Sequence, residues 1–261
     1  MAIGVALGTP LVLLLWLAAV WSKTFAPVGS PELRLEADAG SVVVTAVDRA
    51  DIAVQVSTTG WKISETEVQV QDRLAGNRLE LRVIVPKEGA GFSRHGLRIA
   101  IQVPRGIGCE IKTGEGGITV EGVSGQVKLT TAAGSIRGVS LDGKFEASTG
   151  QGRIQTSGRF DALTLTAGFG AIEAVALAGS KMFGAWRLGT KAGNISLRLP
   201  EGFAADVDAE ASLGKVVMDV PLVYSGAPDL AHVRGSMNGG GELLRVRAEG
   251  GNIRIIKPVS K

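Results

Sequence analysis

The chain is 261 residues long and 45% hydrophobic, with a formal net charge of +3 and one cysteine, Cys109. The small charge and the lack of a basic cluster argue against a nucleic-acid partner. A single cysteine excludes an intramolecular disulfide framework and a multi-cysteine metal site. Glycine is frequent, at 37 residues, and proline is scarce, at 9, which indicates many tight turns in a folded chain.

Residues 1–26 are predicted to be a transmembrane anchor or a signal segment. No charged side chain occurs from Ala2 to Trp21, and a helix of that length spans the hydrocarbon core of a bilayer. Trp21 and the following Lys23 suit the interfacial end of such a helix. The alternatives are a cleaved signal peptide, for which Thr24-Phe25-Ala26 is a poor cleavage site, and a buried core helix.

Residues 30–108 are predicted to form a β-rich N-terminal cap region. Segments such as "NRLELRVIVP" and "LRIAIQVP" alternate apolar and polar residues, which is typical of half-buried strands. Pro86 and Pro104 end these two segments. We expect antiparallel hairpins here, because an uncovered end of a β stack exposes unpaired backbone groups.

Residues 109–261 are predicted to be a repeat region built from a nine-residue phrase. A large apolar residue recurs every nine positions, and glycine stands two positions earlier in six of seven phrases, with Asp161 in the remaining one. The apolar positions are Ile118, Val127, Ile136, Phe145, Ile154, Leu163 and Ile172. Polar residues follow them directly, so each phrase is a short strand with one buried face.

Two phrases make a coil of about 18 residues with two opposed strands, and such coils stack at the ordinary strand spacing. The predicted fold class is therefore an all-β β-solenoid with a β-rich N-terminal cap and an N-terminal transmembrane helix. No helix is expected after residue 25. Further copies of the phrase occur at residues 40–44, 193–197, 214–218 and 251–255, whereas the glycine-rich stretch 221–241 is predicted to be a flexible loop.

The sequence provides no catalytic, cofactor-binding or metal-binding residue that can be assigned. His95 and His232 are expected to be solvated loop residues. Ser212 and Lys215 match the spacing of a serine–lysine acyl-transfer pair, but that chemistry uses a helical turn and this match overlaps a strand phrase. A calcium-binding repeat would need turn carboxylates, and the corresponding positions hold Thr, Lys, Arg and Gln.

The outward positions of the repeat offer a mixed-charge surface. They include Lys128, Arg137, Arg153, Glu146 and Glu173, the composition expected of a soluble wall. The aromatic pair Phe183 and Trp186 is predicted to pack in the core, and Cys109 is predicted to be a small buried hydrophobic residue.

The repeat phrases resemble a known family. The segments "GEGGITVEGVSGQVKLTTAAGSIRGVSL" and "AGNISLRLPEGFAADVDAEASLGKV" are similar to the bacterial putative-adhesin family of β-strand-repeat proteins, a domain of unknown function related to auto-transporter-adhesin head domains. The likeness covers residues 35–256. It implies an envelope-facing β-solenoid with no established reaction and no functional residues to transfer.

We therefore expect a non-enzymatic cell-envelope protein that serves as an adhesin or a structural surface module. A membrane-anchored sensor or regulatory partner is the alternative, and a polysaccharide-active enzyme is the second alternative. The expected partners are the membrane, through the N-terminal helix, and surface polymers or other envelope proteins, with no nucleic acid. The expected location is membrane-anchored and extracytoplasmic, or secreted or periplasmic if a signal peptide is cleaved.

Overall fold

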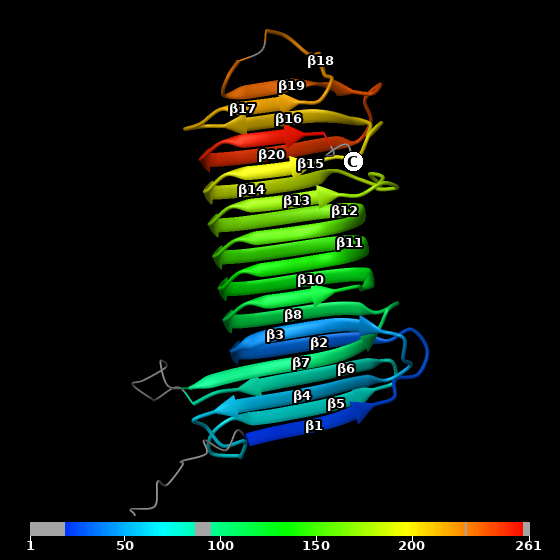
Figure 1. The fold of residues 1–261 in the computed structure, drawn as a ribbon, viewed down its shortest axis with the longest axis vertical. Coiled ribbons are helices and arrows are strands. Elements are labelled where there is room, and N and C mark those ends of the chain that lie inside the picture. The colour runs from blue at the N-terminus through cyan, green and yellow to red at the C-terminus, as the bar shows by residue number, and fades with distance from the viewer. Residues whose placement is uncertain (1–18, 87–94, 228, 258–261) are drawn as a thin grey trace, which may run out of the picture.

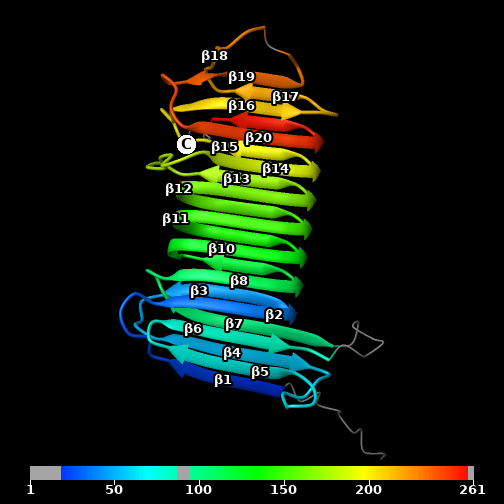
Figure 2. The ribbon, with the colours of Figure 1, turned by 180° about the vertical axis from the view of Figure 1, so that it is seen from behind.

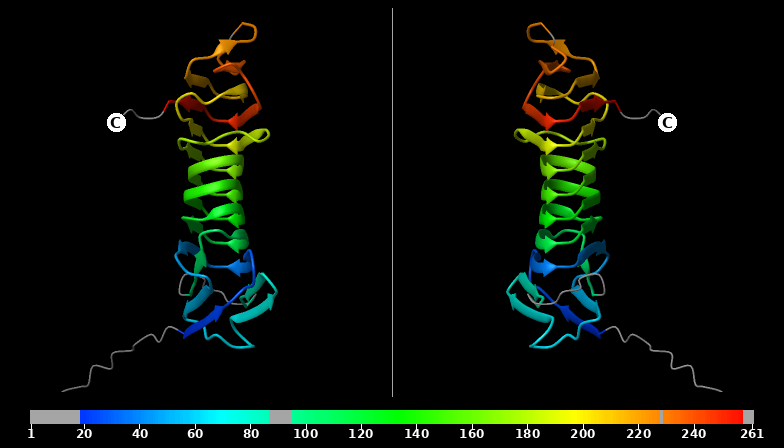
Figure 3. Two further views of the ribbon diagram at one scale, coloured as in Figure 1. Left: turned by 90° about the vertical axis from the view of Figure 1, so that its right-hand side faces the viewer. Right: turned by 90° about the vertical axis from the view of Figure 1, so that its left-hand side faces the viewer.

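The computed structural model describes residues 19–86, 95–227 and 229–257. These residues form 21 strands, β1 to β21, which stack into an elongated column (Figures 1 and 2). Viewed from the side, the column is narrow, with strands running along its two walls (Figure 3). We call the two walls ladder A and ladder B.

Ladder A is a run of hydrogen-bonded neighbours along the length of the column. In spatial order it contains β5 (Gln69–Ala75), β6 (Arg78–Ile84), β2 (Glu32–Ala39), β8 (Gly108–Glu115), β10 (Ser124–Ala133), the second parts of β11 (Ile136–Gln151) and β12 (Ile154–Phe169), β14 (Trp186–Ala192), β20 (Leu243–Gly250), β16 (Ala205–Ala211), β19 (His232–Met237) and β18 (Val223–Tyr224).

Ladder B faces ladder A across the core. In spatial order it contains β1 (Ala19–Phe25), β4 (Ile52–Thr59), β7 (Gly96–Pro104), β3 (Ser41–Val47), β9 (Ile118–Glu121), the first parts of β11 and β12, β13 (Ile172–Ala176), β15 (Ile195–Arg198), β21 (Ile253–Ile256) and β17 (Val216–Asp219). Because β11 and β12 run through both walls, the two ladders belong to one continuous sheet.

The middle of the column is parallel, and partners there lie 18 residues apart. Ile136 pairs with Ile118 on one side and with Ile154 on the other. The seven apolar residues of the nine-residue phrase are all at most 3% exposed, whereas the polar residues that follow them are partly or fully exposed. The predicted inward and outward positions are therefore confirmed, and they explain why the phrase alternates with period two.

The turns of the column need glycine because successive turns touch through their backbones. Gly134 has a φ of +152°, and a Cβ on it would lie 2.0 Å from the carbonyl oxygen of Gly116. The same contact links eight glycines into one column, in the spatial order Gly40, Gly116, Gly134, Gly152, Gly170, Gly193, Gly251 and Gly214. A side chain at these positions would push neighbouring turns apart.

Two pairs of strands, β2 with β3 and β20 with β21, are inserted into the column out of sequence order. Strands β2 and β3 lie between β6–β7 and β8–β9. Strands β20 and β21 lie between β14–β15 and β16–β17, so the red strands of Figure 1 sit between yellow and gold ones. Antiparallel pairs involving β1, β4, β5 and β7 complete one end of the column, and pairs involving β16, β18 and β19 complete the other.

The predicted fold class is wrong in two respects. The described residues contain no helix, so the N-terminal transmembrane helix is not found, and no described helix is long and apolar enough to cross a membrane. The end of the predicted segment 1–26 instead forms β1, antiparallel to β4, with Phe25 buried; residues 1–18 lie outside the described residues. In addition, a β-solenoid stacks its coils in sequence order, and the inserted strands β2, β3, β20 and β21 interrupt that order.

Two local predictions are also corrected. The stretch 221–241 was predicted to be a flexible loop, yet it contributes β18 and β19, because its alternating residues from His232 to Met237 pair with β16; residue 228 is not described. Trp186 is fully buried as predicted, but Phe183 is 75% exposed because it lies in the bend before β14 rather than on a strand.

Candidate functional site

A single line of outward-facing side chains crosses ladder A from one end of the column to the other. Each member is the direct cross-strand partner of the next. We call this line the charge row, and it consists of Arg73, Glu80, Arg34, Glu110, Lys128, Glu146, Thr164, Arg187, Arg245, Asp208 and Arg234. Because opposite residues on neighbouring strands lie close together, their charges interact directly.

The first part of the charge row, from Arg73 to Glu146, alternates strictly in sign. Three cations face three carboxylates, so this part, which we call the balanced half, carries no surplus charge. Lys128 and Glu146 form an ion pair at 2.9 Å, and their hydrogen bond raises the pKa of the Lys128 ammonium. Because each charge in the balanced half has an opposite charge beside it, this half offers little unneutralised charge to a ligand.

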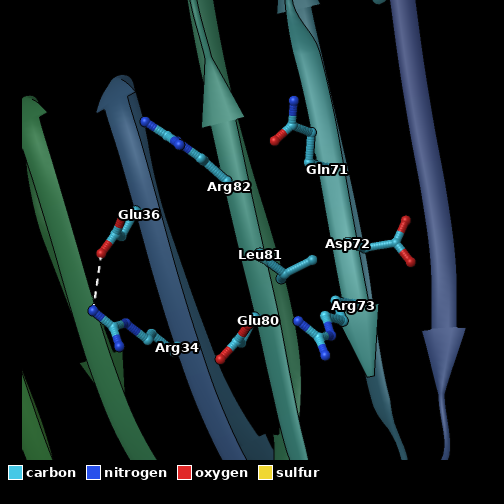
Figure 4. A pocket seen from close by; sticks show the side chains of 8 residues that line it. All are labelled: Arg34, Glu36, Gln71, Asp72, Arg73, Glu80, Leu81 and Arg82. Carbon is cyan, nitrogen blue, oxygen red and sulfur yellow. Dashed lines mark hydrogen bonds and ion pairs between the residues drawn. The ribbon is translucent and has the colours of Figure 1, made fainter. Parts of the chain in front are cut away.

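Figure 4 shows the start of the balanced half, where a shallow depression of about 340 Å³ opens over β2, β5 and β6. Arg34 donates to Glu36 at 3.1 Å, and Arg73 and Arg82 have Glu80 and Glu36 as cross-strand neighbours. The Asp72 side chain points away from this group and accepts a hydrogen bond from Lys23 at 2.5 Å. The depression is therefore lined by charges that already have opposite charges beside them.

The alternation stops beyond Glu146. The next residue in the row is the uncharged Thr164, and after it two arginines, Arg187 and Arg245, are direct partners on β14 and β20. Like charges placed directly opposite each other destabilise a sheet. Among the described residues, no ion pair involves Arg187, whose side chain is exposed.

Beyond this break, four side chains gather around the carboxylate of Asp208 on β16. Arg247 donates to both carboxylate oxygens, at 2.7 and 3.1 Å, and His232 Nε2 lies 2.9 Å from Oδ1. Arg234 Nε lies 3.4 Å from Oδ1, and Arg245 Nε lies 3.6 Å from Oδ2. The arginines remain a third to three-fifths exposed, whereas the Asp208 side chain is 11% exposed.

We call Arg187, Arg234, Arg245 and Arg247 the arginine cluster. Among the described residues, the two cross-strand rows that hold these arginines on β14, β20, β16 and β19 also hold the carboxylates of Asp208 and Glu210, the latter 3.4 Å from Arg247. Within these two rows the arginines outnumber the carboxylates by two, in contrast to the balanced half, whereas the exposed carboxylates of Asp206 on β16 and Glu249 on β20 lie in the adjoining rows. Arginine presents a planar fork of donors that matches carboxylate, sulfate and phosphate groups.

Asp208 is held in its charged form. Partial burial raises the pKa of its carboxyl group, but hydrogen bonds from Arg247 and His232 and the charge of Arg247 outweigh burial, so its pKa lies well below the usual range. The ionised carboxylate accepts hydrogen bonds from Arg247 and lies beside Arg234 and Arg245. Its low pKa is the opposite of what a general acid requires.

The arrangement does not resemble a nucleophilic catalytic site. Asp208 and His232 are paired as in a hydrolase, but among the described residues no hydroxyl is hydrogen-bonded to the other ring nitrogen of His232. Nor, within residues 19–86, 95–227 and 229–257, do three or more His, Cys, Asp or Glu side chains come together where a metal ion could bind. What the geometry supports is binding of an anion.

The residues that the sequence singled out lie in several places. His232 is not a solvated loop residue, because it begins β19 and contacts Asp208, whereas His95 stacks on Trp61 with ring centroids 4.7 Å apart. Ser212 and Lys215 are exposed in a turn between strands, without a helix. Cys109 is buried as predicted, and burial raises the pKa of its thiol to about 12.

The sequence did not predict most of the arginine cluster. Arg187, Arg234 and Arg245 come from strands far apart in the chain, and the inserted β20 brings them together. One local signal was available: Arg245 and Arg247 alternate with apolar residues in "LLRVRAEG", which predicts two cations on the same outward face.

No protein-family model and no curated protein sequence matches the chain. Solved structures to which the chain is similar include a putative cell adhesion protein from Clostridium sporogenes ATCC 15579, with 14% identity, a TM-score of 0.45 and coverage of 92% of this chain and 100% of that one. A putative adhesin from Bacteroides fragilis NCTC 9343 has 15% identity, a TM-score of 0.49 and coverage of 92% and 97%. A putative lipid binding protein from Parabacteroides distasonis ATCC 8503 has 13% identity, a TM-score of 0.41 and coverage of 90% and 96%. Likeness at this level assigns no function.

Proposed function

We propose that this chain is a non-enzymatic cell-envelope protein, an adhesive or structural surface module that binds its partner on the outer face of ladder A. The observation that carries the proposal is the contrast within the charge row. Its balanced half is neutral, whereas the arginine cluster has three exposed arginines and the half-buried Arg247 around two carboxylates. A local surplus of exposed positive charge on a flat wall suits a binding surface.

The rigidity of the column supports the same function. The arginines stand on strands that are paired on both sides within ladder A, above a core that contains Trp186, Leu188 and Val246. Binding to a surface whose backbone is already ordered costs less conformational entropy than binding to a flexible loop. The envelope location rests on the resemblance of the repeat phrases to the putative-adhesin family.

The test has two parts. In cells that make the protein, we expect fractionation to place the full chain with the envelope, and protease added to intact cells or spheroplasts to reach it. Purified chain should also co-sediment with isolated envelopes, and more weakly after Arg234→Gln with Arg245→Gln than after Arg137→Gln with Arg254→Gln on ladder B. Recovery of the chain in the cytosol, protected until lysis, would refute the proposed function.

A further inference from the structure

Gly189 leaves open space beside the break in the charge row. It follows Arg187 by two residues on β14, so it belongs to the same outward face, and its direct partners are Thr166 on β12 and Arg247 on β20. A Cβ at this position would meet nothing within 4 Å. The missing side chain therefore leaves a gap in the wall, bordered by Arg187, Arg247 and Thr166.

An uncharged track of hydroxyl groups leads to this gap. Thr130, Ser148 and Thr166 are successive cross-strand partners on β10, β11 and β12, and Gly189 is the next position in the same line. Their side chains are on the outward face, and Thr166 is exposed. Hydroxyl groups donate and accept hydrogen bonds, as the hydroxyl groups of a sugar do.

The cationic part of this surface is longer than a single anion. From β14 to β19 the charge row crosses three strand spacings, about 14 Å at the usual distance between strands. Arg187 and Arg245 stand at one end of this span and Arg234 at the other. Several acidic groups on one chain would neutralise it better than one small ion.

From this juxtaposition we infer that ladder A binds a linear anionic polysaccharide along the axis of the column, with one acidic group over Gly189 between Arg187, Arg245 and Arg247. Further acidic groups lie toward Arg234, and neutral sugars lie over Thr166, Ser148 and Thr130. This inference rests on the proposed function and names the chemistry of the partner. A membrane surface fits less well, because the side chains that border the gap and line the track are polar.

The like-charge pair is central to the inference. Arg187 and Arg245 repel each other in the free protein, so a sheet selected for stability alone would place a carboxylate or a neutral residue at one of these positions. A bound acidic group removes the repulsion. Replacing both arginines should therefore weaken binding without destabilising the fold, which a merely structural role would not predict.

The experiment measures binding of fluorescein-labelled dextran sulfate to the full chain by fluorescence anisotropy, with uncharged dextran as the negative control. We expect saturable binding that weakens with added salt. Arg187→Gln with Arg245→Gln should lower the affinity at least tenfold and leave the melting temperature unchanged or higher. The matched pair Arg137→Gln with Arg254→Gln removes the same charge from ladder B and should lower the affinity less than twofold.

Further probes separate the possible partners. Polygalacturonate, which carries carboxylates, should compete with dextran sulfate, whereas vesicles containing an anionic phospholipid and single-stranded DNA should compete at least tenfold less well. Equal losses in the two double variants, no binding of either polysaccharide, or better competition by vesicles or DNA would overturn the inference. An envelope location without polysaccharide binding would refute this inference alone, and polysaccharide binding by a cytosolic protein would refute the proposed function alone.

Discussion

The balanced half of the charge row and the arginine cluster both lie on the outer face of ladder A, but their charges are arranged differently. In the balanced half, neighbours such as Lys128 and Glu146 neutralise each other across the strands. In the cluster, Arg187 faces Arg245, and Asp208 is shared by three arginines and a histidine. Because the balanced half forms the same wall without surplus charge, the stability of the column does not explain the surplus in the arginine cluster.

Both regions cover the same apolar core, and a substitution that disrupts this core should lower the stability of the protein the most. Ile136 is 1% exposed between Ile118 and Ile154. Ile136→Asp would bury a charge without a partner, so we expect a loss of more than about 4 kcal/mol and unfolding of the middle strands. Arg137→Asp, one residue along and exposed, should change stability by about 0.5 kcal/mol or less. Similar urea denaturation midpoints for the two variants would show that inside and outside have been misassigned.

Removing one carboxylate from each region sharpens the comparison. Asp208→Asn leaves the arginines around it without their shared counter-charge, and because the group is largely buried we expect a loss of about 2–4 kcal/mol. Glu110→Gln removes a carboxylate from the balanced half, where the ion pair with Lys112 is exposed and 3.7 Å long, and should cost less than about 1 kcal/mol. Chemical denaturation of both variants at neutral pH measures the difference. Equal losses would mean that Asp208 does not organise the cluster.

The contribution of Asp208 should also depend on pH. Its pKa is lowered in the folded state, so on acidification the unfolded chain takes up the proton first. The stabilisation is then fully present above the ordinary carboxyl pKa of about 4 and is lost as the pH falls through the lower folded value. The stability gap between the wild type and Asp208→Asn should therefore be constant from pH 7 to pH 5 and narrow below pH 4. A gap that narrows between pH 7 and pH 5 would implicate another group.

The sequence predicted the building unit better than the way the units are assembled. The phrase with glycine two residues before a large apolar residue located Gly193, Gly214 and Gly251 as turn positions, and all three belong to the glycine column. Their order in space is Gly193, Gly251, Gly214. Identical local phrases cannot specify which copy stacks on which, because the contact between turns involves only backbone atoms.

The candidate site could not be predicted either, because the sequence does not specify which strands become neighbours. Arg187 and Arg245 are separated by 58 residues along the chain, a distance that is not a multiple of the nine-residue period, and they become neighbours because β20 is inserted beside β14. The prediction for the N-terminal segment was wrong for a different reason. Composition favoured a helix up to Trp21, but "AVWSKTF" also pairs along β4 and buries Phe25, and a tertiary contact of this kind outweighs local preference.

One substitution tests most directly whether the surplus charge is kept for an external anion. Arg187→Glu would replace the like-charge pair by a carboxylate opposite Arg245, while its other direct partner, Thr164, is uncharged. Cross-strand pairs of opposite charge contribute about 0.2–1 kcal/mol, so the melting temperature should rise by about 1 °C. The control is Arg137→Glu on ladder B, which makes the same change of charge between the uncharged partners Thr119 and Gln155.

The measurement is the affinity of Arg187→Glu for labelled dextran sulfate, taken together with its melting temperature. If the cluster binds anions, the variant is at least as stable as the wild type and binds at least tenfold more weakly, while Arg137→Glu binds within twofold of the wild type. If Arg187→Glu is stabilised yet binds as tightly as the wild type, the unmatched arginines are not the binding surface and the anion-binding proposal is wrong.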